Sequence, residues 1–257
     1  MLAYFLVVNS FYMVLLMAAG FQLRAHKRVV WQENLWRRLS SSVAPSISVL
    51  APAHNEMATV SQSVRALLAL NYPNLEVILV NDGSRDATLE VLIREFDLTS
   101  IHPIYQRVIR TQPVHGLYRS RTNPGLLVVD KENGGKADAL NAGLNVATGD
   151  LVCAVDADTL IEPDALLRMV RPFLRDREVV AAGGTIRVVN RCDVRAGRVV
   201  DARVPRHPLS GIQVIEYLRA FLFGRLGWNA LGGNLIISGA FGLFRRQAGR
   251  LPARVCG

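Results

Sequence analysis

Two aspartates one residue apart, Asp156 and Asp158, follow a short apolar run in the segment LVCAVDADTLIEP (151–163). If strand geometry persists through the second aspartate, both carboxylates point to the same face. Such carboxylates repel each other unless a cation or a proton lies between them. A Mg²⁺ or Mn²⁺ ion uses one or two carboxylates and completes its shell with phosphate oxygens. A turn or helix cap is the alternative, but Glu162 and Pro163 already supply a helix start, so we favour cation binding.

Three other apolar runs also end in polar, turn-forming segments. These segments are PAHNE (52–56), NDGS (81–84) and DKENGGKADALN (130–141). Each taken alone is an ordinary turn signal. In an open parallel sheet, however, ligands bind beyond the carboxyl ends of the strands, so the fold would bring all four segments to one edge. Lys136 would add positive charge near phosphates there, and Asp82 would accept hydrogen bonds from a base or a ribose.

The elements that must position these residues alternate between strand and helix. Strands are expected at 47–51, 75–80, 126–130 and 150–155. Helices are expected to begin at Thr59, Asp86 and Lys136, with Thr59 as an N-cap. The strands are continuous apolar runs, which predicts an α/β fold with a mostly parallel sheet and helices on both faces. Residues 99–125 are expected to be an irregular, basic surface excursion.

The N-terminus predicts a membrane anchor. Leu2–Leu23 carries no charge and, at ~1.5 Å per helical residue, spans roughly 33 Å, enough for a hydrocarbon core of about 30 Å. The basic residues that follow, Arg24 and Lys27 among them, place the next segment in the cytoplasm by the positive-inside rule. A signal peptide is the alternative, but a basic leading region and a clean cleavage site are missing. We therefore expect an anchor at 1–23 and a basic juxtamembrane linker at 24–45.

Composition narrows the classes of function. The 257 residues carry a net charge of +9, which suits phosphorylated ligands, nucleic acid or anionic lipid. A polyanion- or membrane-surface-binding protein is therefore an alternative, although the arginine-rich stretch 171–206 lacks the interleaved aromatics of a single-strand binder, and no nucleic acid is expected. Three cysteines without a C-x-x-C pair argue against a disulfide framework and a zinc ribbon. Neither G-x-G-x-x-G nor a P-loop sequence follows the first strand.

The motifs PAHNE, VNDGS, KENGGKADALN and VDAD, in this order and spacing, resemble the donor-binding half of a family 2 glycosyltransferase with the GT-A fold. The later SGAFGLFRR (238–246), together with the N-terminal span, is similar to the processive membrane-bound branch of cellulose, hyaluronan and poly-N-acetylglucosamine synthases. The resemblance implies metal-dependent, inverting transfer of a hexose or N-acetylhexosamine from a UDP-sugar to a growing polysaccharide or glycan. It also implies a GT-A domain over 46–250, followed by an atypical tail at 251–257.

The resemblance assigns roles to three groups of residues. The donor nucleotide is expected to contact Pro52, Ala53, Asn55, Glu56, Asp82, Lys136 and Asp156. Among these, Asp82 is expected at the uracil end and Lys136 beside the diphosphate. The metal is expected on the D-x-D pair, Asp156 and Asp158, with Asp158 as the direct ligand. The acceptor side is expected to be lined by the segment that contains Gly239, Phe241 and Arg245.

One part of the family's chemistry has no counterpart in the sequence. Inverting transfer needs a general base to deprotonate the acceptor hydroxyl. In the family, that base is the aspartate of a Glu-Asp motif downstream of the Phe-Arg-Arg segment, and no Glu-Asp pair occurs in these 257 residues. The family's Q-x-x-R-W signature is also missing. We therefore expect a C-terminally truncated chain, with two alternatives: an active transferase, or a fragment that binds the donor and lacks the base.

A further stretch, 213–228, has an amphipathic pattern that fits a membrane interface and core packing equally.

Overall fold

The computed structural model describes residues 1–32, 44–102, 105, 107–156, 159, 161–184, 193–195, 198–201, 211–213, 215–216 and 241–249. Contacts divide the chain into two compact units. One unit comprises Met1–Arg37 and Thr185–Ile237, and the other comprises Arg38–Gly184 and Ser238–Gly257. Asp158, Gly239, the tail at 251–257 and most of 213–228 lie outside the described residues, so the predictions made for them stay predictions.

The first unit begins with a long apolar helix, α1 (Leu2–Gln32). Within it, Leu2–Phe21 has a mean hydropathy of 2.0 and is long and apolar enough to cross a membrane. Large apolar side chains such as Phe5 and Met13 are exposed along this stretch. Length and composition alone would also admit a signal sequence. The same unit contains an antiparallel pair of short strands, β8 (Asp193–Arg195) and β9 (Arg198–Asp201).

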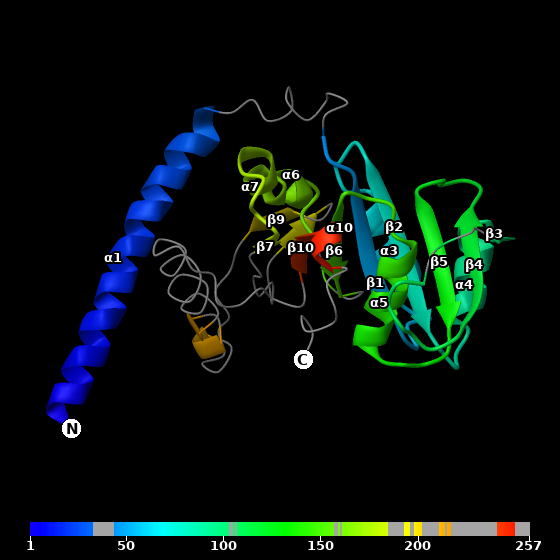
Figure 1. The fold of residues 1–257 in the computed structure, drawn as a ribbon, viewed down its shortest axis with the longest axis horizontal. Helices are drawn as coiled ribbons and strands as arrows, with labels where there is room; N and C mark the ends of the chain where they lie inside the picture. The colour runs from blue at the N-terminus through cyan, green and yellow to red at the C-terminus, as the bar shows by residue number, and fades with distance from the viewer. Residues whose placement is uncertain are drawn as a thin grey trace. The chain divides into compact units, whose positions relative to one another are not determined.

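The second unit is built on an eight-stranded sheet of order β3-β4-β5-β2-β1-β6-β10-β7 (Figure 1). Its strands are β1 (Ile47–Ala53), β2 (Leu75–Asp82), β3 (Leu98–Ile101), β4 (Val114–Ser120), β5 (Leu126–Lys131), β6 (Leu151–Val155), β7 (Ala181–Gly183) and β10 (Phe241–Arg245). The four central strands β5, β2, β1 and β6 are parallel, which confirms the predicted core of the sheet. The strands on both sides of them run antiparallel.

Helices cover both faces of this sheet. The helices of the unit are α3 (Val60–Leu68), α4 (Thr88–Glu95), α5 (Lys136–Val146), α6 (Ala165–Met169), α7 (Arg171–Arg175) and α10 (Arg246–Gly249). Neighbouring strand residues face opposite sides, and the consecutive Val77 and Ile78 of β2 are both fully buried. One face packs on α5, where a Cβ on Gly143 would lie 3.1 Å from the Leu50 side chain. The predicted two-sided cover is therefore confirmed.

One local prediction was wrong, and another was confirmed only in part. Part of the supposed irregular excursion at 99–125 forms β3 and β4, with β4 antiparallel to β5. β4 buries only Leu117 and Ser120 among its seven residues, so it lacks the apolar run that marks a central strand. Thr59 occupies the predicted N-cap position of α3, but its hydroxyl makes no capping bond and donates to the Glu56 carboxylate at 2.5 Å instead.

Candidate functional site

The loops that follow β1 and β2 are joined by hydrogen bonds into one rim. Asn55 adopts a left-handed backbone conformation with φ of 56°. This turn lets its N–H donate to the Ser84 hydroxyl at 2.9 Å, while its side-chain oxygen accepts the Arg85 N–H at 2.8 Å. The Glu56 N–H donates to the Thr88 hydroxyl at 3.0 Å. The predicted nucleoside-pocket residues Asn55 and Glu56 therefore lie beside the NDGS segment.

Pro52 and Ala53 complete this rim from within the sheet. They are the last residues of β1 and lie in register with Val80 and Asn81 of β2. The Ala53 side chain is buried and Pro52 is half-buried. The structure thus brings the β1 residues of the predicted nucleoside pocket to the carboxyl edge, next to the end of β2.

Asp86 stabilises the rim electrostatically. Hydrogen bonding lowers the pKa of its carboxyl group, first through the Thr88 hydroxyl and then through backbone N–H groups, among them that of Met57. The Met57 N–H donates to the carboxylate at 3.1 Å. The carboxylate is therefore ionised at neutral pH and ties the loop after β1 to the start of α4. The sequence prediction that Asp86 opens this helix was close, because α4 begins two residues later.

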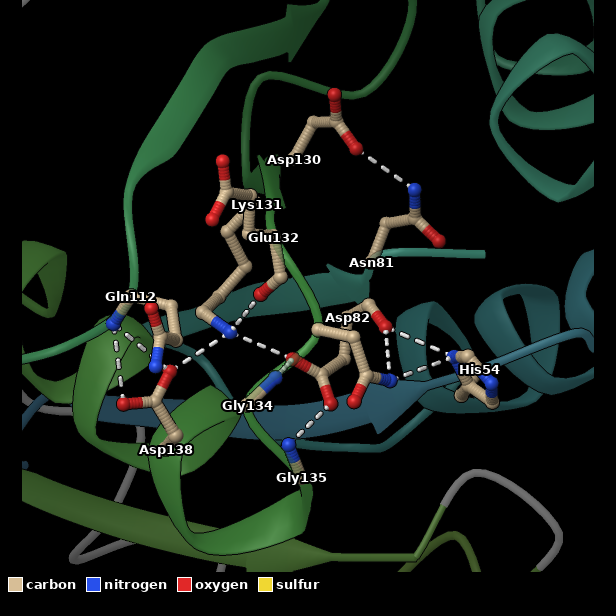
Figure 2. A network of polar contacts seen from close by, with 11 residues as sticks. His54, Asn81, Asp82, Gln112, Asp130, Lys131, Glu132, Gly134, Gly135 and Asp138 are labelled. Carbon is tan, nitrogen blue, oxygen red and sulfur yellow. Dashed lines mark hydrogen bonds and ion pairs between the residues drawn. The ribbon is translucent and has the colours of Figure 1, made fainter. Parts of the chain in front are cut away.

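Asp82, the last residue of β2, holds the turn that precedes α5 (Figure 2). Its side chain is almost completely buried, and its carboxylate accepts the Gly134 N–H at 3.0 Å and the Gly135 N–H at 2.8 Å. The backbone carbonyl of Asp82 accepts the Asn133 side-chain amide at 2.9 Å and the His54 Nδ1–H at 2.8 Å. In this arrangement the carboxylate faces the turn, and its contact with the uracil end of a nucleotide stays a prediction.

Lys131, the last residue of β5, is a functional candidate that the sequence reasoning missed. Its side chain is 0% exposed. Its ammonium group lies 2.5 Å from the Asp82 carboxylate, 2.7 Å from the Asp138 carboxylate and 2.5 Å from the Glu132 carbonyl oxygen. Its signal in the sequence was a lysine placed at the end of the apolar run LLVVD, where the neighbouring side chains are expected to be buried.

Lys136 and Asp156, which were predicted to serve the diphosphate and the metal, form an ion pair. Lys136 is the first residue of α5, and Asp156 directly follows β6. Their side chains are 49% and 31% exposed, so the pair is open to solvent. The geometry therefore brings a cation and a metal-ligand candidate together at the carboxyl edge of the sheet.

The donor set at this edge fits a metal that is completed by its ligand. Within the described part of the chain, no three His, Cys, Asp or Glu side chains are grouped to hold a metal ion. Mg²⁺ and related hard cations use one or two protein carboxylates together with water and substrate phosphates. Asp156, partly exposed beside Lys136, suits one position of such a shell.

Phe241 and Arg245 occupy opposite ends of one strand. β10 runs antiparallel to β6, which pairs Phe241 with Val155 near the carboxyl edge and Arg245 with Leu151 at the far edge. The strand direction therefore separates the two residues that were predicted to line the acceptor side. Phe241 lies close to the end of β6 that leads to Asp156, whereas Arg245 does not.

The contacts of Arg245 are structural. Its Nε donates to the Val179 carbonyl at 2.7 Å, and its guanidinium lies 5.4 Å from the centroid of the Phe173 ring. A further nitrogen donates to the Asp176 carbonyl at 3.3 Å. These contacts join β10 to the segment that precedes β7. The role of Arg245 on the acceptor side stays a prediction.

A cavity of about 340 Å³ is lined by residues of both the rim and the turn before α5, among them Ser84, Asp86, Lys131 and Asn133. It is lined from the ends of β2 and β5 and from α4, by residues that include Asn81, Asp86, Glu90, His115 and Asp130. None of the residues predicted to contact the donor or the metal lines it. The open edge at Lys136 and Asp156 is the candidate site for a diphosphate and a metal, and this cavity adjoins its rim through Ser84 and Asp86.

Comparison with known proteins places the chain among glycosyltransferases. The model of the family described as "Glycosyl transferase family 2" matches residues 48–248. The chain is 30% identical over 203 residues to poly-beta-1,6-N-acetyl-D-glucosamine synthase of Staphylococcus epidermidis and to that of Staphylococcus aureus (strain COL). Each alignment covers 79% of this chain and 40% of the relative, so the chain spans about two-fifths of the length of these relatives.

A solved structure supports the same fold. The mannosyltransferase PcManGT from Pyrobaculum calidifontis, in complex with GDP-Man and Mn²⁺, superposes with a TM-score of 0.50 at 21% identity. The match covers 93% of this chain and 59% of that chain. At this level of identity, the two proteins are alike in fold only. That fold is a mixed α/β sheet with a parallel core, as predicted from the sequence.

Proposed function

The chain belongs to glycosyl transferase family 2, and from this premise we propose that it binds a UDP-sugar with a divalent metal and transfers the sugar, with inversion, to a growing polysaccharide or glycan. The observation that carries the proposal is the solvent-open ion pair of Lys136 and Asp156 at the carboxyl edge of the parallel strands. This edge is where open α/β sheets bind their ligands. The proposed metal is Mg²⁺ or Mn²⁺, and the Mn²⁺ held by the archaeal mannosyltransferase supports it.

The start of α5 is suited to a diphosphate. Backbone N–H groups and the helix dipole make the N-terminus of a helix attractive to anions. Lys136, the first residue of α5, adds a full positive charge there. Lys136 forms an ion pair with Asp156, which directly follows β6. When the donor binds, we expect Lys136 to turn to the diphosphate while Asp156, with Asp158, holds the metal.

Lys136 then contributes to the transfer itself. Negative charge develops on the departing nucleoside diphosphate, and a preformed cation at that place stabilises it. A bound divalent metal supplies further positive charge to the same leaving group. Pro52, Ala53, Asn55, Glu56 and Asp82 are proposed to form the nucleoside side of the site, because they share its rim.

The sugar, the acceptor and the membrane are proposed on separate grounds. The polymer in the names of the staphylococcal relatives supports an N-acetylhexosamine donor and a polysaccharide acceptor. The length and hydropathy of Leu2–Phe21 support an anchor in membrane lipid, with the transferase domain on the cytoplasmic side, because basic residues follow the span. Gly239 and Phe241 remain the residues proposed for the acceptor side.

A second candidate function is donor binding without turnover. The two functions share the donor site and differ only in transfer. Release of UDP from UDP-N-acetylglucosamine in the presence of an oligosaccharide acceptor separates them, because only the enzyme turns over.

Calorimetric titration of the full chain with UDP tests the donor site. We expect binding that requires Mn²⁺ or Mg²⁺ and that weakens roughly tenfold or more in Asp156→Asn and Asp158→Ala, because each substitution removes a carboxylate proposed to hold the metal. Glu95→Gln is the matched control, because it removes a carboxylate from an exposed ion pair with Arg65. Equal UDP affinity with and without metal would contradict the proposal. Steeply salt-dependent binding of polyanions, with no UDP binding, would instead indicate a polyanion-binding protein.

A further inference from the structure

We propose that Lys131 is a positioning residue, which fixes the turn between β5 and α5 and thereby places Lys136 at the donor site. This inference rests on the proposed function. The Lys131 side chain is 0% exposed, and its ammonium group is directed at acceptors of the protein itself. We therefore assign its effect on donor binding to the groups that it holds.

The buried ammonium gathers three separate parts of the chain. Asp82 comes from the end of β2, Asp138 from the first turn of α5, and the third acceptor is the backbone carbonyl of Glu132 (Figure 2). A lysine ammonium has three protons, so these acceptors match its capacity. Without the cation, two carboxylates would face each other inside the protein, which is strongly unfavourable.

These contacts constrain the turn from both sides. Asp82 accepts the N–H groups of Gly134 and Gly135, and a Cβ on Gly134 would lie 2.5 Å from the Asp138 carboxylate. Gly135 has φ of 84°, which side-chain-bearing residues rarely adopt. The turn is thus held tightly between the two partners of Lys131.

The position of Lys136 follows from that of the turn. Lys136 directly follows Gly135, and its ammonium reaches Asp156 at the end of β6. Asp138, which contacts Lys131, lies in the same helical turn as Lys136. If Lys131 acts through this turn, its removal weakens UDP binding only while Lys136 is present to contact the diphosphate.

Hydrogen–deuterium exchange of the full chain without nucleotide tests the positioning directly. The variants are Lys131→Met and the double variant Lys131→Met/Asp138→Asn, which removes one of the two carboxylates left without a cation and so protects the fold. We expect the amides of 133–137 to exchange roughly tenfold faster in both, because local opening becomes easier. Arg65→Met, which breaks an exposed ion pair, is the control and should leave them unchanged. Unchanged exchange of 133–137 in the double variant would overturn the proposal.

A double-mutant cycle with UDP and Mn²⁺ tests the route to the donor. Every variant of the cycle carries Asp138→Asn. In that background, Lys131→Met should weaken UDP binding roughly tenfold. When Lys136→Met is also present, Lys131→Met should weaken UDP binding by less than about twofold, since the effects of coupled residues are not additive. Full additivity would overturn the proposed route, because it would show that Lys131 acts independently of Lys136. If the parent chain fails to bind UDP, the proposed function fails, and the exchange experiment still decides the role of Lys131.

Discussion

Lys136 and Asp156 form an ion pair that joins the first turn of α5 to the end of β6. The two residues come from different strand–helix units, and β1 and β2 separate β5 from β6 in the sheet. Helix α5 crosses this distance by packing on β1 and β2. The carboxyl edge therefore acquires a cation next to an anion, a combination that a diphosphate and a divalent metal together complement.

Replacing Lys136 with methionine should weaken UDP binding about tenfold or more, because a charge-assisted hydrogen bond to the diphosphate is lost. Uridine, which lacks the phosphates, should bind with unchanged affinity. Calorimetry of both ligands in the presence of Mn²⁺ measures the difference, with Arg65→Met as the charge control. An equal loss of affinity for uridine would show that Lys136 shapes the nucleoside pocket rather than contacting the diphosphate.

Asp150 should make stability depend on pH. The Ser46 N–H and then the Ser46 hydroxyl lower the pKa of its carboxyl group, donating to it at 3.0 and 2.8 Å. A pKa that is lower in the folded state stabilises the protein above the unfolded value of about 3.9, and this contribution is lost as the pH falls through the folded pKa. Asp150→Asn should lower the free energy of unfolding by about 1 kcal/mol at pH 7. The expected loss is small because the site is exposed to solvent.

Urea unfolding of the parent and Asp150→Asn between pH 3 and 8 measures this dependence. The gap between the two free energies of unfolding should narrow below about pH 4. Glu90→Gln, an exposed carboxylate on α4, is the control and should show a much smaller gap. A gap that stays constant down to the acid limit would mean that Asp150 acts without its charge.

Two glycines should differ in their tolerance of alanine. Gly83 and Gly135 both have positive φ, 62° and 84°, which costs an alanine roughly 1–2 kcal/mol. A Cβ on Gly83 would also lie 2.5 Å from the Asn133 backbone nitrogen, whereas a Cβ on Gly135 would meet nothing within 4 Å. Gly83→Ala should therefore lower the thermal midpoint more than Gly135→Ala. Equal midpoints would mean that the loop at Asn133 moves aside at no cost.

Arg245→Met should reduce stability and leave UDP binding unchanged. The substitution removes donors from the carbonyls of Val179 and Asp176, and such losses cost about 1–3 kcal/mol. Chemical denaturation measures the first effect and calorimetry with UDP the second. Reduced acceptor binding in a variant of unchanged stability would restore the predicted role of Arg245 on the acceptor side.

A charge in the middle of α1 should weaken membrane retention. Leu2–Phe21 is the candidate span, and a lysine at the centre of a span costs about 2.5–3.5 kcal/mol. Alkaline carbonate extraction of cell membranes should leave the parent chain in the pellet and release part of Val14→Lys. Val14→Leu is the matched control. Complete release of the parent chain would exclude an anchor at this helix.

The parallel core was predictable because each of its strands has a local pattern in the sequence. Each central strand is a mostly apolar run that is followed by polar residues, as the run from Leu126 to Val129 illustrates, and the sheet brings those ends to one edge. β4 was not predictable in the same way, since an antiparallel strand near the edge needs only a few buried residues, such as Leu117. The pairing of β10 with β6 depends on contacts between distant segments, which no local pattern records.

The site was predictable to the extent that its residues follow strands. Asp82, Lys136 and Asp156 all come to the predicted edge. The environment of each side chain was not, because burial depends on the whole fold: Asp82 is 3% exposed, whereas Asp156 remains accessible. Lys131 was missed because a lysine that neutralises buried carboxylates cannot be distinguished in sequence from one at the surface.

The late position of β10 in the chain has a consequence for biosynthesis. β6 ends at Val155, but its antiparallel neighbour begins only at Phe241. While the ribosome translates the intervening segment, β6 already has β1 on one side and presents a bare backbone on the other. Unpaired strand edges recruit other chains, and domains fold as their segments emerge. Nascent molecules paused before Phe241 should therefore depend on chaperones more than molecules released after Arg245.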